Sequence, residues 1–241
     1  MRWLPRRPRT KRGALAAVTG ALVAVVLAGA AVIYFVIFPT SSPKPFALST
    51  TTVSSPVGSA SALAGDWTIG AGSQAGYRVR EKLAFLPALS DAVGRTSAIT
   101  GGATFSDAGG RLTATAASFV IDVETLKSNE QLRDEHIRTI GLQSATYPKA
   151  TFILATPLML PANALTGAVV DVSVTGVVTI HGTARRLTIP LQLRLSTSRI
   201  QAVGSLTFPW GEFNMTAPSV GGFVNVTDMA TMEFDLDLRR A

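Results

Sequence analysis

The chain has 241 residues, 47% of them hydrophobic, and it contains no cysteine. Its formal net charge is +7, but six of the 22 Lys and Arg residues lie within positions 1–12, which leaves 16 basic and 15 acidic residues in the remainder. This near-neutral remainder argues against a basic groove for nucleic acid. The lack of cysteine excludes disulfides, thiolate nucleophiles and thiolate metal sites.

An uncharged, strongly apolar run covers residues 13–38, directly after the basic residues 1–12. About 20 such residues span the roughly 30 Å hydrocarbon core of a bilayer. The run is longer than the apolar region of a cleaved signal peptide, about 7 to 15 residues, and no small-residue cleavage site follows it. We therefore predict a basic cytoplasmic tail at 1–12 and an uncleaved transmembrane signal anchor at 13–38. A cleaved signal peptide is the competing interpretation.

The charge on the tail predicts the orientation of the chain, because basic residues beside a transmembrane helix stay in the cytoplasm. We expect a single-pass cell-membrane protein with its N-terminus in the cytoplasm and its C-terminal domain outside. Residues 39–64 are rich in Ser, Thr, Pro and Ala and lack periodicity. Since such a composition buries too little apolar surface to fold, we predict a linker there and a folded domain at 65–241.

Apolar and polar residues alternate along several stretches of this domain, which is typical of half-buried antiparallel strands. The alternation is clearest in 186–195 and 224–238. The other predicted strands are 67–79, 97–105, 111–123, 150–156, 166–180 and 200–208. Within 111–123 the apolar residues change from even to odd positions, which predicts a β-bulge near 116–118. The run 67–79 is interrupted at 70–72, where glycines indicate a bend.

Eight or nine antiparallel strands in meander order can close into a barrel, in which the two edge strands pair with each other and no unpaired edge of the sheet remains. We predict an all-β fold: an antiparallel eight-stranded lipocalin-like barrel with one short helix, preceded by a transmembrane helix. A barrel of this size is either filled by its side chains or able to hold one small ligand. Because the inward positions are almost wholly aliphatic, we expect any ligand to be lipid-like.

The one predicted helix of the domain covers residues 128–139. Ser128, followed three residues later by Gln131, has the form of a capping box. Leu132, His136 and Ile140 recur at a spacing of four, which places them on one helix face. We predict that this face covers one side of the barrel.

Four short motifs follow one another in the chain: Val-Glu-Thr-Leu at 123–126, Leu-Arg-Asp-Glu-His-Ile-Arg at 132–138, Tyr-Pro-Lys-Ala-Thr-Phe at 147–152, and Thr-Gly-Val-Val-Thr-Ile-His-Gly-Thr at 175–183. In this order they resemble the YceI family, and the resemblance covers about residues 65–239. It implies a lipocalin-like barrel that holds a long amphiphilic isoprenoid, such as a polyprenyl chain or a quinone.

Parity along the strands predicts the residues of the barrel wall that contact a ligand, with a filled core as the alternative for each. They are Phe85, Ile99, Phe105, Val172, Val174, Leu191 and Phe234. His136, on the predicted inward helix face, and Arg133, within a motif of the resemblance, are candidate contacts to a lipid head group. The alternatives are a hydrogen-bonded structural histidine and an ion-paired surface arginine.

No motif supports catalysis or metal binding. The two histidines, His136 and His181, lie on separate elements and make a poor metal site. Ser73 lacks the flanking glycines of a nucleophile elbow. We therefore expect no enzymatic activity and no cofactor, with a non-covalently bound isoprenoid lipid or quinone as the ligand; turnover that depends on His136 or Asp134 would indicate an enzyme instead.

The sequence thus predicts a membrane-anchored extracytoplasmic binding protein that holds an isoprenoid-type lipid, polyprenyl or quinone, inside a β-barrel. Residues 13–38 attach it to the membrane. The alternative is a cell-envelope adaptor with a solid barrel, which binds another protein through its surface. Lipid that co-purifies with the protein would separate these two functions, and a homodimer stays open for both.

Overall fold

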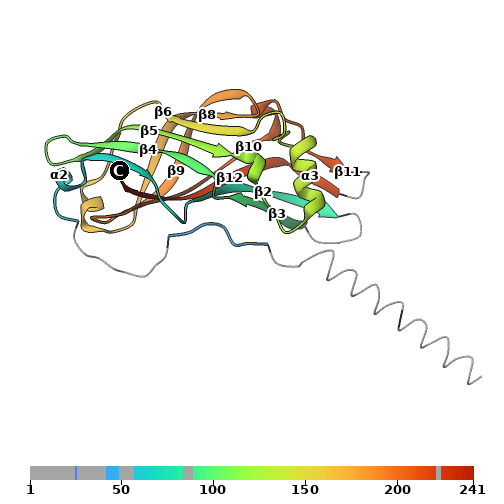
Figure 1. Ribbon diagram of the computed structural model, residues 1–241, viewed down its shortest axis with the longest axis horizontal. Helices are drawn as coiled ribbons and strands as arrows, with labels where there is room; N and C mark the ends of the chain where they lie inside the picture. The colour runs from blue at the N-terminus through green and yellow to red at the C-terminus, as the bar shows by residue number, and fades with distance from the viewer. Residues whose placement is uncertain (1–24, 26–41, 49–56, 84–88, 221–223) are drawn as a thin grey trace, which may run out of the picture. The chain divides into compact units, whose positions relative to one another are not determined.

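The computed structural model describes residues 42–48, 57–83, 89–220 and 224–241, together with Val25 (Figure 1). The predicted tail, and the predicted anchor apart from Val25, lie outside the described residues. Within the ranges given, no helix is long and apolar enough to cross a membrane. Residues from Ser42 to Ala241 form one compact unit.

Within this unit the described strands form one antiparallel sheet. Their bounds are β1 (Gly65–Ile69), β2 (Gln74–Leu83), β3 (Leu89–Thr96), β4 (Ile99–Asp107), β5 (Leu112–Asp122), β6 (Lys149–Leu154), β7 (Leu158–Met159), β8 (Val170–Ile180), β9 (Thr183–Leu195), β10 (Ile200–Pro209), β11 (Ser219–Val220) and β12 (Val224–Arg240). Strands β1, β4, β5, β6, β8, β9, β10 and β12 follow in this order, and β12 pairs back onto β1. The predicted eight-stranded antiparallel barrel is confirmed.

Strand β12 is long enough to pair with two successive strands along one edge. Its last residues, 238–240, pair with β1, and residues 224–235 pair with β2. Between β1 and β2 the chain turns at Gly70, whose N–H donates to the Asp237 carbonyl oxygen at 2.7 Å. The Ser73 hydroxyl, on the far side of the turn, accepts from the Asp237 N–H at 2.9 Å. The predicted interruption is therefore confirmed, and the β2–β3 hairpin extends the sheet beyond the closed barrel.

The predicted bulge lies in β5 at Thr115. Thr104 of β4 pairs with Ala116, whereas Phe105 pairs with Ala114, so Thr115 has no partner on β4. This is one residue before the predicted range. The extra residue allows Ala114 and Phe119 to point into the barrel although they lie at positions of opposite parity.

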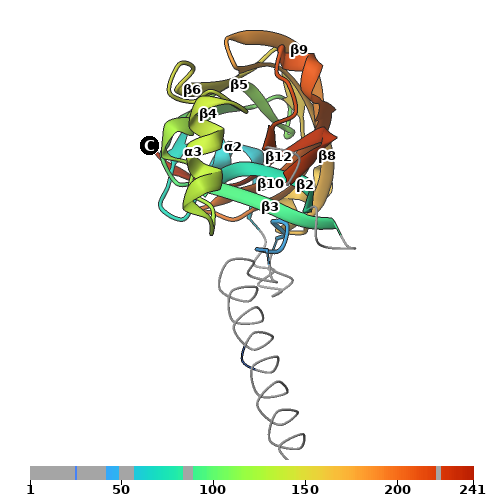
Figure 2. The ribbon, with the colours of Figure 1, turned by 90° about the vertical axis from the view of Figure 1, so that its right-hand side faces the viewer.

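Five helical segments accompany the sheet in the described part of the chain. They are α2 (Ala60–Leu63), η1 (Val123–Thr125), α3 (Gln131–Thr139), η2 (Ala162–Thr166) and η3 (Trp210–Phe213). Figure 1 shows α2 and α3 at opposite ends of the barrel. Figure 2 looks along the barrel from the α3 side, with α3 lying across that end.

Helix α2 falls inside the predicted linker 39–64 and is part of the folded domain. Leu63 is fully buried, and its carbonyl oxygen accepts a hydrogen bond from Trp67 Nε1 at 2.9 Å. The Val57 N–H donates to the Leu165 carbonyl oxygen at 3.0 Å. The linker prediction is therefore wrong for residues 57–64. Their sequence consists mostly of Ala, Ser and Gly, and its two larger apolar residues, Val57 and Leu63, are buried against the end of the barrel.

Residues 42–48 form an extended segment on the outside of the barrel, called here the outer strap. Arg78 and Arg95 donate to carbonyl oxygens of the outer strap at 2.7 and 2.5 Å. The Arg95 guanidinium lies 3.8 Å from the centre of the Phe46 ring, and Leu48 is buried. The linker prediction is wrong here as well, because barrel side chains provide contacts that the segment's composition does not indicate.

Helix α3 begins three residues later than predicted. It starts at Gln131, and Glu130 in the N-cap position makes no side-chain capping bond. The Ser128 hydroxyl accepts instead from the Glu130 N–H at 3.1 Å, and the Ser128 N–H donates to Asp134 Oδ1 at 2.8 Å. The predicted capping box is therefore wrong, because Ser128 forms a local turn with Glu130 and Asp134 rather than binding the Gln131 amide.

The inward face of α3 also differs from the predicted one. Leu132 is 76% exposed and Ile140 is 50% exposed, whereas Ile137 is 7% exposed and faces the barrel. Arg133, one turn before Ile137, donates to Glu81 of β2 at 2.7 Å. This ion pair orients the helix so that Arg133 and Ile137 face inward, while the apolar side chains of Leu132 and Ile140 stay exposed.

The outer face of β12 carries acidic residues at odd positions, including Asp235. Burial raises the pKa of Asp235 above its ordinary value because it disfavours the charged carboxylate. The folded protein therefore holds this proton more tightly than the unfolded chain does, and the free energy of unfolding falls as the pH rises through this titration. Asp235→Asn should be more stable than the natural protein at pH 7, and the gain should vanish below the ordinary pKa of 3.8. Urea denaturation of the variant and the natural protein, at pH 7 and at a pH below 3.8, measures this difference in the free energy of unfolding.

Asp122 provides a control, because its pKa is shifted in the opposite direction. A hydrogen bond from Lys149 lowers the pKa of the Asp122 carboxyl, so this group adds stability above its ordinary pKa and loses it as the pH falls. Asp122→Asn should consequently be less stable than the natural protein at pH 7. A stability change of the same sign in both variants would contradict this account.

Candidate functional site

The barrel encloses a cavity of about 230 Å³ whose wall is almost wholly hydrocarbon. Most of the lining residues belong to two clusters of buried side chains. One cluster includes Leu63 of α2, and the other includes Trp210 of η3. Inward positions of the strands form most of the wall, and Ile137 of α3 completes it. A cavity of this character is poorly suited to water and well suited to an apolar guest.

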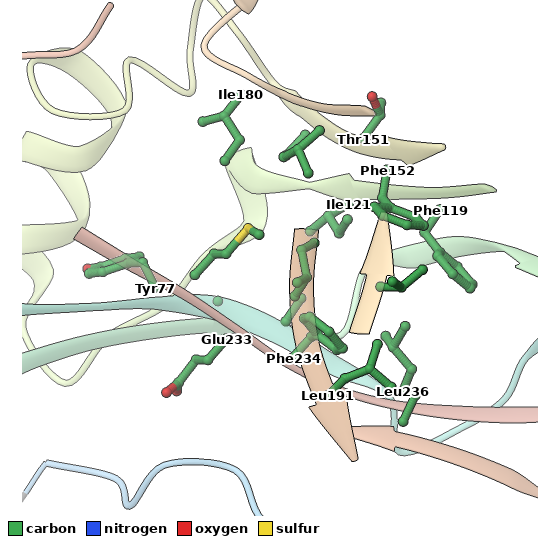
Figure 3. A pocket seen from close by; sticks show the side chains of 18 of the residues that line it. Tyr77, Phe119, Ile121, Thr151, Phe152, Ile180, Leu191, Glu233, Phe234 and Leu236 are labelled. Atoms are coloured by element: carbon green, nitrogen blue, oxygen red, sulfur yellow. The ribbon is translucent and has the colours of Figure 1, made fainter. Parts of the chain in front are cut away.

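Aromatic side chains from three strands meet around the middle of the cavity. Figure 3 shows Phe119 of β5 and Phe152 of β6 above Phe234 of β12 and Leu191 of β9. The centres of the Phe119 and Phe152 rings are 6.3 Å apart. A Cβ atom on Gly204 would lie 2.6 Å from the Phe234 ring, so the glycine leaves the space that this ring occupies.

The structure places the predicted wall residues in different surroundings. Those that line the cavity are Phe105, Val174, Leu191 and Phe234. Ile99 is buried in the surrounding core, and Val172 is half-buried against that core, but neither borders the cavity. Phe85 lies outside the described residues. Parity predicts the face that a side chain occupies, but side chains from other strands decide whether the space in front of it is filled. Ligand contact stays a prediction for all of them.

Several cavity residues were not predicted. Phe119 follows the bulge and shares the inward parity of Ile121, so the alternation in β5 could have identified it. Phe152 lies in the six-residue strand β6, which is too short for a clear alternation. Trp210 lies in a 3-10 helix, where neither the strand nor the α-helix period applies.

The two predicted head-group contacts do not line the cavity. Arg133 donates from Nη2 to Glu81 Oε1 and from Nη1 to Asn129 Oδ1, each at 2.7 Å. Glu81 is 6% exposed, so the ion pair is internal rather than part of a solvated helix face. His136 is half-buried, and its neighbour Ile137 takes the inward position.

A different polar residue, Tyr77 of β2, borders the cavity at its α3 end. The Tyr77 hydroxyl oxygen is buried beside the Ser128 hydroxyl. Burial raises the pKa of the Tyr77 phenol far above its ordinary value, and the charges of Arg133, Asp134 and Glu81 modify the shift. The phenol is therefore neutral and carries its proton at physiological pH.

The cavity wall offers an apolar binding surface. Within the described ranges, no three His, Asp or Glu side chains come together as a metal site. His181, in the turn between β8 and β9, lies 2.9 Å from Gln143 Oε1 through Nε2 and contacts the Tyr147 ring, 4.2 Å between ring centres. These contacts hold the His181 ring against the neighbouring loop.

Comparison with known sequences gives one family. The model of the YceI-like domain matches residues 67–238, which include the closed barrel and helix α3. No curated protein matches the chain.

Three solved structures share the fold. A polyisoprenoid binding domain from Saccharophagus degradans is 20% identical, with a TM-score of 0.55, over 74% of this chain and 99% of that chain. BcnA from Burkholderia cenocepacia is 22% identical, with a TM-score of 0.52, over 70% of this chain and 98% of that chain. The Campylobacter jejuni YCEI protein is 14% identical, with a TM-score of 0.50, over 66% of this chain and 91% of that chain.

Proposed function

This chain belongs to the YceI family, and from that premise we propose that it holds one isoprenoid-type amphiphilic lipid, a polyprenyl compound or a quinone, inside its barrel. The observation that carries the proposal is the apolar cavity of about 230 Å³. A solid barrel, as required for the adaptor alternative, would have its strand side chains fill this space. The isoprenoid class is supported by the Saccharophagus degradans structure, which is described as a polyisoprenoid binding domain.

The wall of the cavity explains why a hydrocarbon chain would bind. Each methylene group that leaves water for an apolar interior contributes about 0.8 kcal/mol. Because the wall offers almost no hydrogen-bonding groups, a sugar or nucleotide would lose its bonds to water without replacement. A branched chain with repeated methyl groups would contact both the aromatic rings at Phe119 and Phe234 and the aliphatic residues between them.

The proposal also places the protein at a membrane and assigns it no chemical reaction. The apolar run at 13–38 would anchor the chain as a single-pass protein with the barrel outside the cytoplasm. The membrane that holds the anchor would then supply the lipid. Binding, transport or storage of the lipid needs no catalytic group, and the proposal contains none.

The test is to identify what the protein carries. The full-length chain is purified from bacterial membranes in a mild detergent, and native mass spectrometry is followed by solvent extraction and mass analysis of the released molecules. A hydrophobic isoprenoid in a one-to-one ratio is expected. Empty protein that also fails to take up added polyprenols and quinones would overturn the proposal and favour the envelope adaptor.

A further inference from the structure

We propose that the barrel wall carries a second binding site, which takes an extended peptide of another protein as an added β-strand. The site is a window between β9 and β10, defined here as residues 186–190 of β9 and 205–209 of β10. The peptide has apolar side chains at alternate positions and an acidic side chain beside Arg186. This inference goes beyond the proposed function, because it concerns the wall of the barrel and not the molecule held inside.

The pairing of β9 with β10 stops halfway along both strands. Residues 191–195 of β9 pair with residues 200–204 of β10. Beyond them, β9 pairs only with β8 and β10 only with β12 among the described strands. At the far side of the window, Asn214 Nδ2 donates to the Thr183 hydroxyl at 3.0 Å, so the opening is bounded at both ends.

A proline explains why the hydrogen-bond ladder stops where it does. Along an antiparallel strand, the backbone groups of alternate residues point to opposite neighbours. The hydroxyls of Thr188 and of its β8 partner Thr175 are 2.9 Å apart, as expected for a pair whose backbones do not bond each other. The backbone groups of Thr188, and of Pro190 two residues later, therefore point to β10. Pro190 has no N–H to donate there, so the ladder ends.

Strand β10 shows the same arrangement on its side of the window. Its backbone groups that point to β9 belong to Val203, which pairs with Gln192, and to every second residue after it. Pro209 is one of these, and it also lacks an N–H. The window thus keeps backbone donors that no described strand uses, on Arg186, Thr188, Ser205 and Thr207. Unpaired groups of this kind are a template for another strand.

The side chains at the window determine which peptide fits. Leu187 and Leu206 have the inward parity of their strands, but they are half-buried and do not line the cavity. An added strand places every second side chain beside them, so these positions of the peptide are apolar. Arg186 is exposed on the outer face and has no hydrogen bond or ion pair among the described residues. An acidic side chain on the outer face of the peptide would complement its charge.

A groove on the outer surface continues from the paired end of the window. It has a volume of about 640 Å³, and its lining includes Pro190 of β9 and Gly204 of β10. A Cβ atom on Gly204 would lie 2.9 Å from the Pro190 carbonyl oxygen, so glycine allows the two strands to meet there. Phe46 of the outer strap forms another part of the lining. The groove leaves room for the peptide to continue over the outside of the barrel.

Amide hydrogen exchange tests the window before any peptide is added. It is followed residue by residue by NMR on the full-length protein in detergent. The N–H groups of Thr188 and Thr207 are expected to exchange at least about tenfold faster than those of Ile189 and Leu206, which point to β8 and β12. Equal protection of the four groups would mean that the ladder continues through the window, and the inference would be overturned.

Two labelled peptides then test the docking on the natural protein. The probe is Thr-Val-Glu-Val-Thr, blocked at both ends, and its control has N-methyl groups on the glutamate and on the valine after it. The methyl groups remove one donor toward each neighbouring strand and keep every side chain. Fluorescence anisotropy should show one-to-one binding of the probe and at least about fivefold weaker binding of the control. The bound probe should also slow the exchange of the Thr188 and Thr207 amides.

Two variants assign the binding to the window. Thr188→Pro removes a donor that points to the window, so it should bind the probe at least about fivefold more weakly. Arg186→Gln should bind the probe about threefold more weakly, and it should bind a peptide with glutamine in place of the glutamate as well as the natural protein does. The lipid extracted from the same samples should be unchanged, which keeps this result separate from the proposed function.

Three outcomes would overturn the inference. The first is that the probe does not bind, or binds no better than its N-methylated control. The second is that Thr188 and Thr207 become protected without peptide as the protein concentration rises, which would make a second copy of this chain the occupant. The third is that added lipid, but not the probe, slows the exchange of these amides, which would make the window an entrance to the cavity.

Discussion

Ala202→Phe should yield a folded protein that carries at least about tenfold less lipid than the natural protein. Ala202 is buried on β10 and lines the cavity. A phenyl group at this position would occupy space that the proposed lipid tail needs. Overpacking a filled core costs about 1–3 kcal/mol, but here the added group enters existing empty volume, so the free energy of unfolding should fall little or even rise.

The matched control is Ser205→Phe on the same strand. Ser205 is exposed on the outside of the barrel. The substitution therefore adds the same phenyl group without placing it in the cavity. Both variants are purified alongside the natural protein, and the lipid extracted per mole of protein is measured. Equal lipid content in Ala202→Phe and the natural protein would show that the bound molecule lies elsewhere.

Glu233→Gln should lower the free energy of unfolding by about 3 kcal/mol, the typical result of breaking a buried ion pair. Glu233 is 3% exposed on the outer face of β12. It accepts from Arg78 Nε at 3.1 Å and from Arg95 Nη2 at 2.8 Å. Figure 3 shows its carboxylate pointing away from the cavity, so the variant should leave lipid binding unchanged. Loss of its charge leaves two adjacent arginines under the outer strap without their shared counterion.

Glu212→Gln is the control for this prediction. Glu212 lies 3.6 Å from Arg185 Nε, and the two side chains are 35% and 40% exposed. An exposed ion pair of this kind contributes about 0–1 kcal/mol. Chemical denaturation of both variants in the same buffer gives the comparison. If Glu233→Gln lowers the free energy of unfolding as little as Glu212→Gln does, water enters beneath the outer strap and screens the charges of Glu233 and its two arginines.

The strands and their inward faces follow from local sequence. In residues 232–238 of β12 the even positions are apolar and the odd positions acidic, and the side chains occupy the two faces accordingly, with Leu236 and Leu238 inside and Asp235 outside. The change of parity in β5 likewise predicts a bulge, which lies at Thr115. These features are readable because a strand alternates with period two, so each residue's face depends on its immediate neighbours.

The orientation of α3 and the extent of the domain depend on residues far apart in the chain. Leu132, His136 and Ile140 form the more apolar stripe, yet Arg133 and Ile137 face inward because Glu81, 52 positions earlier, pairs with Arg133. Residues 57–64 have the composition of a linker, yet Leu63 is buried because the barrel end lies against it. In both cases the deciding contact is made by a segment that a local pattern does not contain.

The amino-acid order alone was sufficient for an all-β barrel with an aliphatic interior, because periodicity and composition are local properties. Whether that interior is filled or hollow was decided by the tertiary structure, since it depends on how side chains from different strands share one volume. Phe105 borders the cavity and Ile99, on the same strand, does not.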